Sequence, residues 1–371
     1  MGLFGKQKSK SFLGIDLGSS GIKVVEFENK KGRPTLLTYG YAEFSSIEAG
    51  ETLFEQTKRT GELLAQVCKQ AGVRSTQAMA ALPTSKVFTT ILSLADGKDQ
   101  RQRQLAVDAE ITKLAPLPLS EMITQTTSLD EEKNGKKDQK KHKDAAKTPE
   151  APKQKQFRVL VTGAAKTFIQ KYIEIFKTAK LNLQAIDTES LALVRSLIGK
   201  DKGAIMILDI GSKRTNIIIV EKGIPFVSRS INIGGNSITS ELMRQMSLSE
   251  EDAERMKRDL GTVSPVDSSS EGLPKLLEMM MLPLVNEIRF AFQLYANMDL
   301  AQIKKVEKIV VTGGSAHLPK IPEYLAQVLN LNVYRGDPWA RVVYPNELAG
   351  VLEEIGPRMS VAIGLAMREM E

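Results

Sequence analysis

A short turn rich in glycine and hydroxyl side chains occurs twice in the sequence, each time between an acidic residue and a stretch of β-branched residues. Glycine lets the backbone approach phosphate oxygens closely, and successive turn amides can form a nest for an anion. Hydroxyl groups and a lysine could add donors to the same phosphates. The residues that could bind phosphate are Gly18, Ser19, Ser20, Gly21 and Lys23 in the first turn, and Gly211, Ser212, Lys213 and Thr215 in the second.

Asp16 and Asp209 are the acidic residues that precede the two turns. A carboxylate would not contact phosphate directly, because like charges repel. It could instead hold Mg²⁺, which keeps several water ligands and takes few protein carboxylates. We therefore expect Asp16 and Asp209 to hold a metal ion through water. One such turn alone would favour an ordinary Asp-Gly hairpin, whereas two copies with the third turn described below favour a nucleotide site.

The stretches that follow the two turns, 22–25 and 217–220, are rich in Ile and Val. This composition predicts a second strand, so that each turn closes a hairpin. In a dinucleotide-binding loop of the Rossmann type the glycine turn opens a helix, and the pattern argues against that fold. Two hairpins of the same kind suggest duplicated halves that face one nucleotide.

A third glycine turn follows the apolar stretch 308–312 and precedes a helical pattern at 322–329. Its two adjacent glycines would let the backbone lie flat against a base or a ribose. Taken alone, the turn is better explained as a plain loop between a strand and a helix. The residues that could contact a nucleoside here are Gly313, Gly314, Ser315 and Leu318.

The order of hairpin, hairpin and diglycine turn resembles the actin-type ATPase fold, whose members include actin, MreB, FtsA, DnaK-type chaperones and sugar kinases. Further stretches are similar to the PilM family, the cytoplasmic actin-like proteins of type IV pilus assembly. We therefore expect an α/β protein with the actin-like ATPase fold, in which two duplicated lobes surround a nucleotide cleft. The stretches that carry the PilM resemblance are 12–26, 107–111, 115–119, 159–166, 185–195, 230–239 and 362–368.

The resemblance implies ATP and Mg²⁺ as ligands, and it adds candidate binding residues. Gly234 and Gly235 lie within one of the matching stretches. Glu254 and Lys257 resemble the residues of a helix that reach the ribose and the base in MreB-like members.

Glu189 resembles the family's acidic residue before a short helix of Ala and Leu, and we expect it to orient the water that attacks ATP. Slow, Mg²⁺-dependent ATP hydrolysis would follow. Ser190 comes next, where many members carry Pro. The alternative role for Glu189 is structural, since an acid at a helix N-terminus is favoured by the helix dipole.

The resemblance also implies a partner and a location. PilM-like proteins bind the short cytoplasmic N-terminal tail of PilN, a membrane protein, in a groove between the first large subdomain and an inserted small one. An extended tail in a groove gains affinity from backbone hydrogen bonds and selectivity from pockets. We expect a cytoplasmic protein that is peripheral to the inner membrane through this partner and that meets other pilus assembly components. ATP bound across the lobes could set the width of the groove.

The expected domain organisation follows the family. The large subdomain of the first lobe comprises 1–83 and 182–203, and an FtsA/PilM-type small subdomain is inserted at 84–181. The large subdomain of the second lobe comprises 204–245 and 305–371, and its small subdomain 246–304. Within the last of these, a long helix over 273–298 is predicted to bury a stripe of residues at helical spacing. The stripe consists of Met279, Leu282, Val285, Ile288, Phe292 and Tyr295.

Composition and charge exclude several other classes. The 371 residues are enough for two or more domains, and the single cysteine, Cys68, excludes an internal disulfide. Cys68 lies in an apolar helical pattern, so we expect it to be buried. No apolar run approaches the length of a transmembrane helix. The two histidines lie in unrelated settings, which leaves no His/Cys cluster with metal-ligand spacing.

A lysine-rich segment at 130–156 carries part of the formal net charge of +7. Nine lysines and six acids are interleaved there without aromatic or large aliphatic side chains. Such a segment cannot bury enough surface to fold, so we expect a disordered loop and no nucleic-acid binding.

Two other functions stay open. An FtsA-like filament protein would continue into an amphipathic membrane helix, whereas this chain stops at Glu371, directly after the apparent last core helix. A small-molecule kinase would need an acceptor pocket with a general base, and the sequence offers no constellation for one.

Overall fold

The computed structural model describes residues 11–44, 51–97, 99–130, 156–259, 275–318 and 320–370. They divide into two compact units, one made of the chain up to Ser85 and from Gln170 onward, and one running from Lys86 to Ile169. Apart from its two ends, the segment 130–156 that the sequence predicts to be disordered lies outside the described residues. Among the helices described, none is long and apolar enough to cross a membrane.

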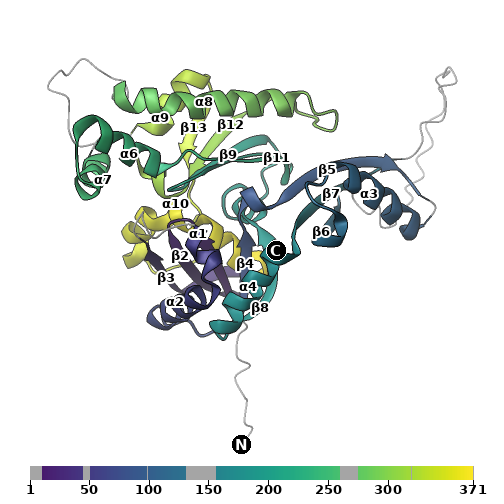
Figure 1. The fold of residues 1–371 in the computed structure, drawn as a ribbon, viewed down its shortest axis with the longest axis horizontal. Coiled ribbons are helices and arrows are strands. Elements are labelled where there is room, and N and C mark those ends of the chain that lie inside the picture. Colours follow the sequence, from purple (N-terminus) through teal and green to yellow (C-terminus); the bar gives the residue numbers. More distant parts are fainter. Residues whose placement is uncertain are drawn as a thin grey trace, which may run out of the picture. The chain divides into compact units, whose positions relative to one another are not determined.

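The first sheet of the larger unit opens with the hairpin that the sequence predicts (Figure 1). The strand of β-branched residues after Gly21 pairs antiparallel with the strand that ends at Gly18. β3 also pairs antiparallel with β2, whereas β1–β4 and β4–β8 are parallel pairs, and the order is β3-β2-β1-β4-β8. The strands are β1 (Ser11–Gly18), β2 (Gly21–Lys30), β3 (Arg33–Glu43), β4 (Gln77–Leu82) and β8 (Asn182–Thr188).

The second sheet repeats this arrangement, with the order β11-β10-β9-β12-β13. The strands β9 and β10 form the second predicted hairpin. The strand before the third glycine turn, β12, pairs in parallel with β9. The strands are β9 (Ala204–Ile210), β10 (Thr215–Glu221), β11 (Ile224–Ile231), β12 (Lys308–Thr312) and β13 (Asn332–Arg335). We call the two sheets with their helices the first and second lobe.

Helices cover both sheets. In the first lobe they are α1 (Glu51–Glu55), α2 (Thr57–Gln70), α4 (Lys166–Thr178) and α5 (Glu189–Leu193), which continues as a π-helical turn, Val194–Ile198. In the second lobe they are α6 (Gly235–Met246), α7 (Glu250–Asp259), α8 (Lys275–Ala296) and α9 (Ile321–Leu329). Single 3₁₀ turns occur at Thr84–Lys86, Leu119–Glu121, Gly314–His317, Asn346–Leu348 and Arg368–Met370.

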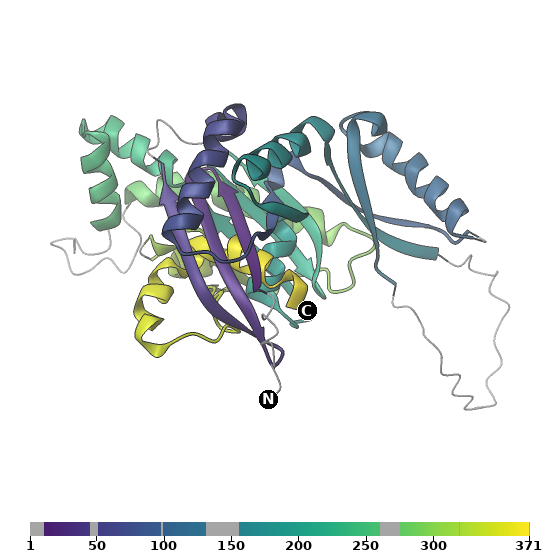
Figure 2. The ribbon, with the colours of Figure 1, turned by 90° about the horizontal axis from the view of Figure 1, so that it is seen from below.

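The helix α10 (Ala349–Ala366) packs against β1 and β2 of the first lobe and also contributes Leu365 to a core shared with β9 and β10 (Figure 2). Glycines allow its backbone to approach closely. A Cβ on Gly14 of β1 would lie 2.1 Å from the carbonyl oxygen of Ala362, and a Cβ on Gly364 would lie 1.8 Å from that of Ala192. Because α10 touches both sheets, it ties the two lobes together.

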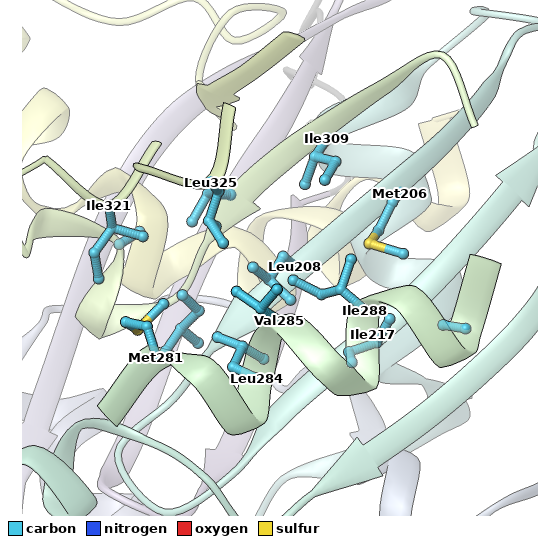
Figure 3. Close-up of a cluster of buried hydrophobic side chains, with 14 of the residues drawn as sticks. Met206, Leu208, Ile217, Met281, Leu284, Val285, Ile288, Ile309, Ile321 and Leu325 are labelled. Atoms are coloured by element: carbon cyan, nitrogen blue, oxygen red, sulfur yellow. The ribbon is translucent and has the colours of Figure 1, made fainter. Parts of the chain in front are cut away.

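The core of the second lobe lies between its sheet and α8 (Figure 3). Val285, Ile288 and Tyr295 are fully buried, as the sequence predicts. Leu282 is an error in the predicted stripe, because it is 53% exposed. The buried face is carried instead by Met281, Leu284 and Ala291. Packing against the sheet therefore determines which residues of α8 are buried. The side chain of Met279, another residue of the predicted stripe, lies outside the described part of the structure.

The smaller unit contains a three-stranded antiparallel sheet in the order β5-β7-β6 and a helix that packs on it. Its elements are β5 (Phe88–Ala95), α3 (Gln100–Leu114), β6 (Met122–Ser128) and β7 (Gln156–Ala165).

The boundary of this unit differs from the predicted insertion at 84–181. The end of α4 belongs to the first lobe, because Tyr172 and Phe176 are buried there. The Tyr172 hydroxyl donates to the Ala81 carbonyl at 2.8 Å, and its ring stacks on Phe54. The assignment of the remaining subdomains to the family's scheme stays a prediction.

Candidate nucleotide site

The first and second glycine turns, residues 18–21 and 211–214, meet in the structure. The hydroxyl oxygens of Ser19 and Ser212 lie 3.1 Å apart, although 193 residues separate them in the chain. The close approach brings the ends of β1 and β9 together. The sequence predicts two turns that face one ligand, and these two turns are adjacent.

Gly18 and Gly21 of the first turn are each required to be small, but by different neighbours. A Cβ on Gly21 would lie 1.9 Å from the carbonyl oxygen of Ala42, so packing on β3 requires glycine there. A Cβ on Gly18 would instead lie 2.7 Å from the Lys23 ammonium and 3.3 Å from the Asp16 carboxylate. Glycine at position 18 therefore leaves room next to a charged pair.

The second turn is braced by the start of α6. The amide of Gly235 donates to the Gly211 carbonyl at 2.9 Å, and the amide of Asn236 donates to the Ser212 carbonyl at 2.7 Å. A Cβ on Gly234 would lie 2.5 Å from the Ser212 carbonyl oxygen. Gly234 and Gly235 thus let α6 approach the turn, and their predicted contact with a nucleotide would add to this packing role.

Thr215 differs from the predicted role. Its side chain is fully buried, and its hydroxyl donates to the Ile233 carbonyl at 2.7 Å. The structure therefore places this hydroxyl in the second lobe's core, where it cannot also donate to a phosphate. Leu318 is buried too and lines a small apolar cavity with Ile210, Thr215 and Met281.

The third glycine turn, 313–315, lies against the second. Gly313 has φ of +89°, and a Cβ there would lie 2.6 Å from the Asp209 carboxylate. The Ser315 hydroxyl donates to the Gly211 carbonyl at 3.3 Å. In the described part of the chain, no atom beyond Gly314 and its two neighbours lies within 4 Å of the Cβ position of Gly314, so the backbone at that residue has open space.

Lys257 and Glu254 of α7 extend the site toward α6. The Lys257 ammonium lies 2.6 Å from the Glu254 carboxylate, 2.9 Å from the Thr239 hydroxyl and 3.4 Å from the Gly235 carbonyl. Both side chains therefore approach the helix start that braces the second turn.

Three carboxylates lie behind the turns, of which Asp16 is buried and Glu189 and Asp209 are partly buried. The Asp16 carboxylate pairs with the Lys23 ammonium at 3.0 Å. The Glu189 carboxylate accepts hydrogen bonds from the Thr84 amide at 2.8 Å and the Thr84 hydroxyl at 3.1 Å. The side-chain amide of Asn216 donates to Glu189 at 3.1 Å and to Asp209 at 3.0 Å, which links a residue of the first lobe to one of the second.

The electrostatics of this group favour a cation. Burial raises the pKa of Glu189 from 4.5 to about 8, and the negative charges of Asp16 and Asp209 raise it further. Burial also raises the pKa of Asp209 to about 6, with Asp16 adding to the effect and the Asn216 hydrogen bond opposing it. The Lys23 ammonium pairs with Asp16 and lowers the pKa of Asp209, yet Asp16 still raises the pKa of both other carboxyl groups, so the donor set fits an additional positive charge.

The type of cation follows from the number of ligands. Within the described ranges, no group of three or more His, Cys, Asp or Glu side chains has the geometry to hold a metal by itself. A metal at Asp16 and Asp209 would have to complete its shell with water and phosphate oxygens, as Mg²⁺ does. The residues present therefore fit a hydrated Mg²⁺ that accompanies a phosphate ligand.

Two residues of the group were not identified from the sequence. Asn216 on β10 lies directly opposite Asp209 on β9, just as Lys23 on β2 lies directly opposite Asp16 on β1. An amide within a run of Ile and Val is the signal that could have revealed it. Thr84 carries no comparable signal, because its contact with Glu189 spans 105 residues.

Comparison with solved structures shows the fold. A chain of a PilM-PilN type IV pilus biogenesis complex superposes with a TM-score of 0.77 at 21% identity, covering 97% of this chain and 98% of that one. The ethanolamine utilization protein EutJ from Carboxydothermus hydrogenoformans gives a TM-score of 0.50 at 17% identity, covering 96% and 89%. The chain therefore has the predicted actin-like α/β fold.

Sequence comparison shows the family. The cell division protein FtsA of Bacillus subtilis is 27% identical over 225 residues, which are 56% of this chain and 48% of that protein. FtsA of Borreliella burgdorferi is 24% identical over 236 residues, or 57% and 54%. The chain spans about half the length of these curated relatives. The family described as "Type IV pilus assembly protein PilM" matches residues 14–370. The chain belongs to this PilM family.

Proposed function

We propose that the chain binds ATP with Mg²⁺ between its first and second glycine turns and serves as an assembly scaffold of a type IV pilus machine. The observation that carries the nucleotide part is the contact of Ser19 and Ser212 near the buried carboxylate of Asp16 and the partly buried carboxylates of Asp209 and Glu189. Two backbone turns and a surplus of negative charge suit a ligand that brings phosphates and a divalent cation together.

Each residue then has a defined task. The amides of the first turn, with Ser19, Ser20 and Lys23, would bind phosphate oxygens on one side, and Ser212 and Lys213 would bind them on the other. Asp16 and Asp209 would hold Mg²⁺ through its water ligands, and the ion would neutralise phosphate charge. The open backbone at Gly314 would lie against the nucleoside, and Glu254 and Lys257 would bind its ribose or base.

Glu189 is the candidate for a role in hydrolysis. Its carboxylate is held by Thr84 and Asn216 at the centre of the group, so it could accept a hydrogen bond from a water and orient it. Burial keeps the pKa of Glu189 near 8, so the free carboxyl group is mostly protonated at neutral pH and a poor base. We therefore propose slow turnover, with ATP binding as the main event.

The test of the nucleotide part is equilibrium binding of ATP with and without Mg²⁺. We expect Asp16→Asn and Asp209→Asn to lose the Mg²⁺ dependence of binding, because each removes one carboxylate from the ion's outer shell. Glu189→Gln should bind MgATP as the unmodified protein does and hydrolyse it more slowly. Undiminished, Mg²⁺-dependent binding by both aspartate variants would contradict the assignment.

The scaffold part rests on family membership and on the likeness to a chain of a PilM-PilN complex. We propose that the partner is the cytoplasmic N-terminal tail of a PilN-like membrane protein, bound as an extended segment. The location would then be cytoplasmic and peripheral to the inner membrane. Fluorescence anisotropy with a labelled tail peptide tests this, and measurements with ATP, with ADP and without nucleotide test the coupling. A scrambled peptide that binds as tightly would contradict a specific partner.

An FtsA-like role in cell division is the second candidate, because the curated relatives reported above are FtsA proteins. The family match over nearly the whole chain favours the pilus role. Deletion of the gene separates the two: loss of pili with normal division supports the first, and filamentous cells support the second.

A further inference from the structure

Five lysines of the larger unit occupy left-handed backbone conformations, and four of them lie at one end of the two sheets. Lys31, Lys180, Lys222 and Lys304 have φ of 54°, 58°, 54° and 62°. Residues with a Cβ rarely adopt such a φ, and Gly, Asn and Asp adopt it most readily. The turns therefore disfavour lysine. The ammonium groups of Lys222 and Lys304 donate to the Gln302 side chain and to the Met298 carbonyl, which gives these two lysines a local role as well as a charge.

The two hairpins show this most clearly. Lys31-Gly32 joins β2 to β3, and Lys222-Gly223 joins β10 to β11, each as a two-residue loop with positive φ at both positions. Such type I′ loops favour Asn-Gly or Asp-Gly. The chain uses Lys-Gly at the equivalent turn of both duplicated hairpins.

Lys180 stands in a similar position at the end of α4. Its amide donates to the Lys177 carbonyl, and the amide of Leu181 donates to the Phe176 carbonyl, in a pattern that usually places Gly or Asn at position 180. The chain does use those residues elsewhere, with Gly72 after α2 and Asn330 after α9.

All four lysines lie at the sheet ends opposite to the glycine turns of the candidate nucleotide site. The β2–β3 loop lies beside the start of β1, because β2 is antiparallel to β1, and Lys180 precedes the parallel strand β8. In the same way Lys222 lies beside the start of β9, and Lys304 precedes β12.

Other charged residues at these ends leave a basic surplus. The four lysines are exposed, and among the described residues Lys31 and Lys180 form no ion pair. Further basic residues here are Lys30, Arg33, Arg74, Lys200, Lys202, Lys305 and Lys308, and the acids are Glu28, Asp201, Glu221, Asp299 and Glu307. Glu28 pairs with Lys30, Asp201 pairs with Lys308, and Glu221 is buried.

We propose that these lysine-bearing turns contact the anionic surface of a lipid bilayer. Lysines near an anionic bilayer each add a favourable electrostatic contribution that salt screens. The loops contain no aromatic residue on which a nucleic-acid base could stack. None of their described apolar side chains is large and exposed, so the contact would be electrostatic and reversible, without insertion.

The turn geometry supplies an unusually clean test. Lys31→Asn, Lys180→Asn, Lys222→Asn and Lys304→Asn together remove four charges and place at each turn a residue that suits a left-handed conformation. The variant should therefore unfold at the same or a higher temperature than the unmodified protein. A control with four charges removed elsewhere is Lys58→Gln, Lys86→Gln, Lys113→Gln and Lys320→Asn, where Lys320 is also left-handed.

The measurement is flotation of the full chain with vesicles of phosphatidylcholine alone and mixed with phosphatidylglycerol. We expect binding to the mixed vesicles only, weakening with salt. The Asn variant should bind more than about tenfold more weakly, and the control should bind like the unmodified protein. Double variants of Lys31 with Lys180 and of Lys222 with Lys304 assign the effect to each lobe.

Three results would overturn the proposal. They are absence of binding to anionic vesicles at low salt, equal loss of binding in the Asn variant and the control, and full binding by the Asn variant. Tighter binding to a duplex oligonucleotide than to the vesicles, lost in the Asn variant, would assign the surface to nucleic acid instead.

Discussion

Asn216 on β10 lies directly opposite Asp209 on the paired strand β9, and its side-chain amide donates to the Asp209 carboxylate at 3.0 Å. The equivalent pair of the first hairpin is Lys23 and Asp16, again seven residues apart and 3.0 Å between their polar atoms. The two lobes thus use one geometry with different chemistry. The lysine neutralises its aspartate, whereas the asparagine leaves Asp209 charged and also reaches Glu189.

The first prediction concerns this shared donor. Asn216→Ala should lower the free energy of unfolding by about 1–3 kcal/mol, because two partly buried carboxylates lose a hydrogen bond at once. Asn216→Asp should destabilise the protein more, since it adds a fourth carboxylate to the group. Urea unfolding measures both effects. Added MgATP should recover more of the loss in Asn216→Asp than in Asn216→Ala, and an equal recovery would argue against a cation at this site.

The second prediction is a pH dependence. The folded protein raises the pKa of Asp209 from 3.8 to about 6 and that of Glu189 from 4.5 to about 8, mainly through burial. Between the ordinary and the raised pKa values the folded state binds more protons than the unfolded state. This contribution to stability is therefore complete below about pH 4, and it is lost as the pH rises through 6 and then through 8.

The melting temperature of the nucleotide-free protein checks this. It should fall between pH 6 and pH 8, and Glu189→Gln should flatten that part of the curve by replacing the titrating group with a neutral one. Glu241→Gln is the control, because Glu241 is a solvent-accessible carboxylate of α6 outside the group. A Glu189→Gln curve as steep as that of the unmodified protein would show that Glu189 does not carry the effect.

The third prediction uses the contact between the glycine turns. Ser19→Cys with Ser212→Cys should form a disulfide under mild oxidation, since the two hydroxyl oxygens lie 3.1 Å apart. The native Cys68 should not interfere, because burial raises its pKa to about 12. MgATP bound between the turns should separate them and slow the reaction, which non-reducing gels can follow.

Each single cysteine variant is the control for this experiment, because neither has a near partner. If MgATP left the rate of disulfide formation unchanged while still binding to the double variant, the nucleotide could not lie between the two turns.

Local features of the sequence predicted a large part of this architecture. The hairpins depend on turn chemistry and strand composition within about a dozen residues, as for Asp16 to Lys23, and the strand before Gly313 depends on the short apolar run within 308–312. Such elements can be predicted from sequence because residues close to them along the chain determine their structure.

The predictions that were wrong or incomplete concern features that depend on contacts between residues far apart in the sequence. The phase of α8 buries Met281 and exposes Leu282, because several consecutive residues there are apolar and the sheet beneath selects which face of the helix is buried. The limit of the smaller unit is set by Tyr172, which packs against a residue of β4. Glu189 was predicted from a resemblance, but its bonds to Thr84 and Asn216 join three separate segments, and no short pattern encodes them.

The last prediction tests the helix that joins the lobes. Gly364→Ala would place a Cβ 1.8 Å from the Ala192 carbonyl oxygen, so α10 or α5 must move. We expect a loss of several kcal/mol in the free energy of unfolding, as for other overpacked cores. Gly350→Ala is the matched control on the same helix, because no atom lies within 4 Å of its Cβ position. Alanine there should stabilise the helix by about 0.5–1 kcal/mol. Since α10 contacts both sheets, Gly364→Ala should also weaken MgATP binding, and a variant that unfolds earlier yet binds normally would show that α10 does not set the distance between the glycine turns.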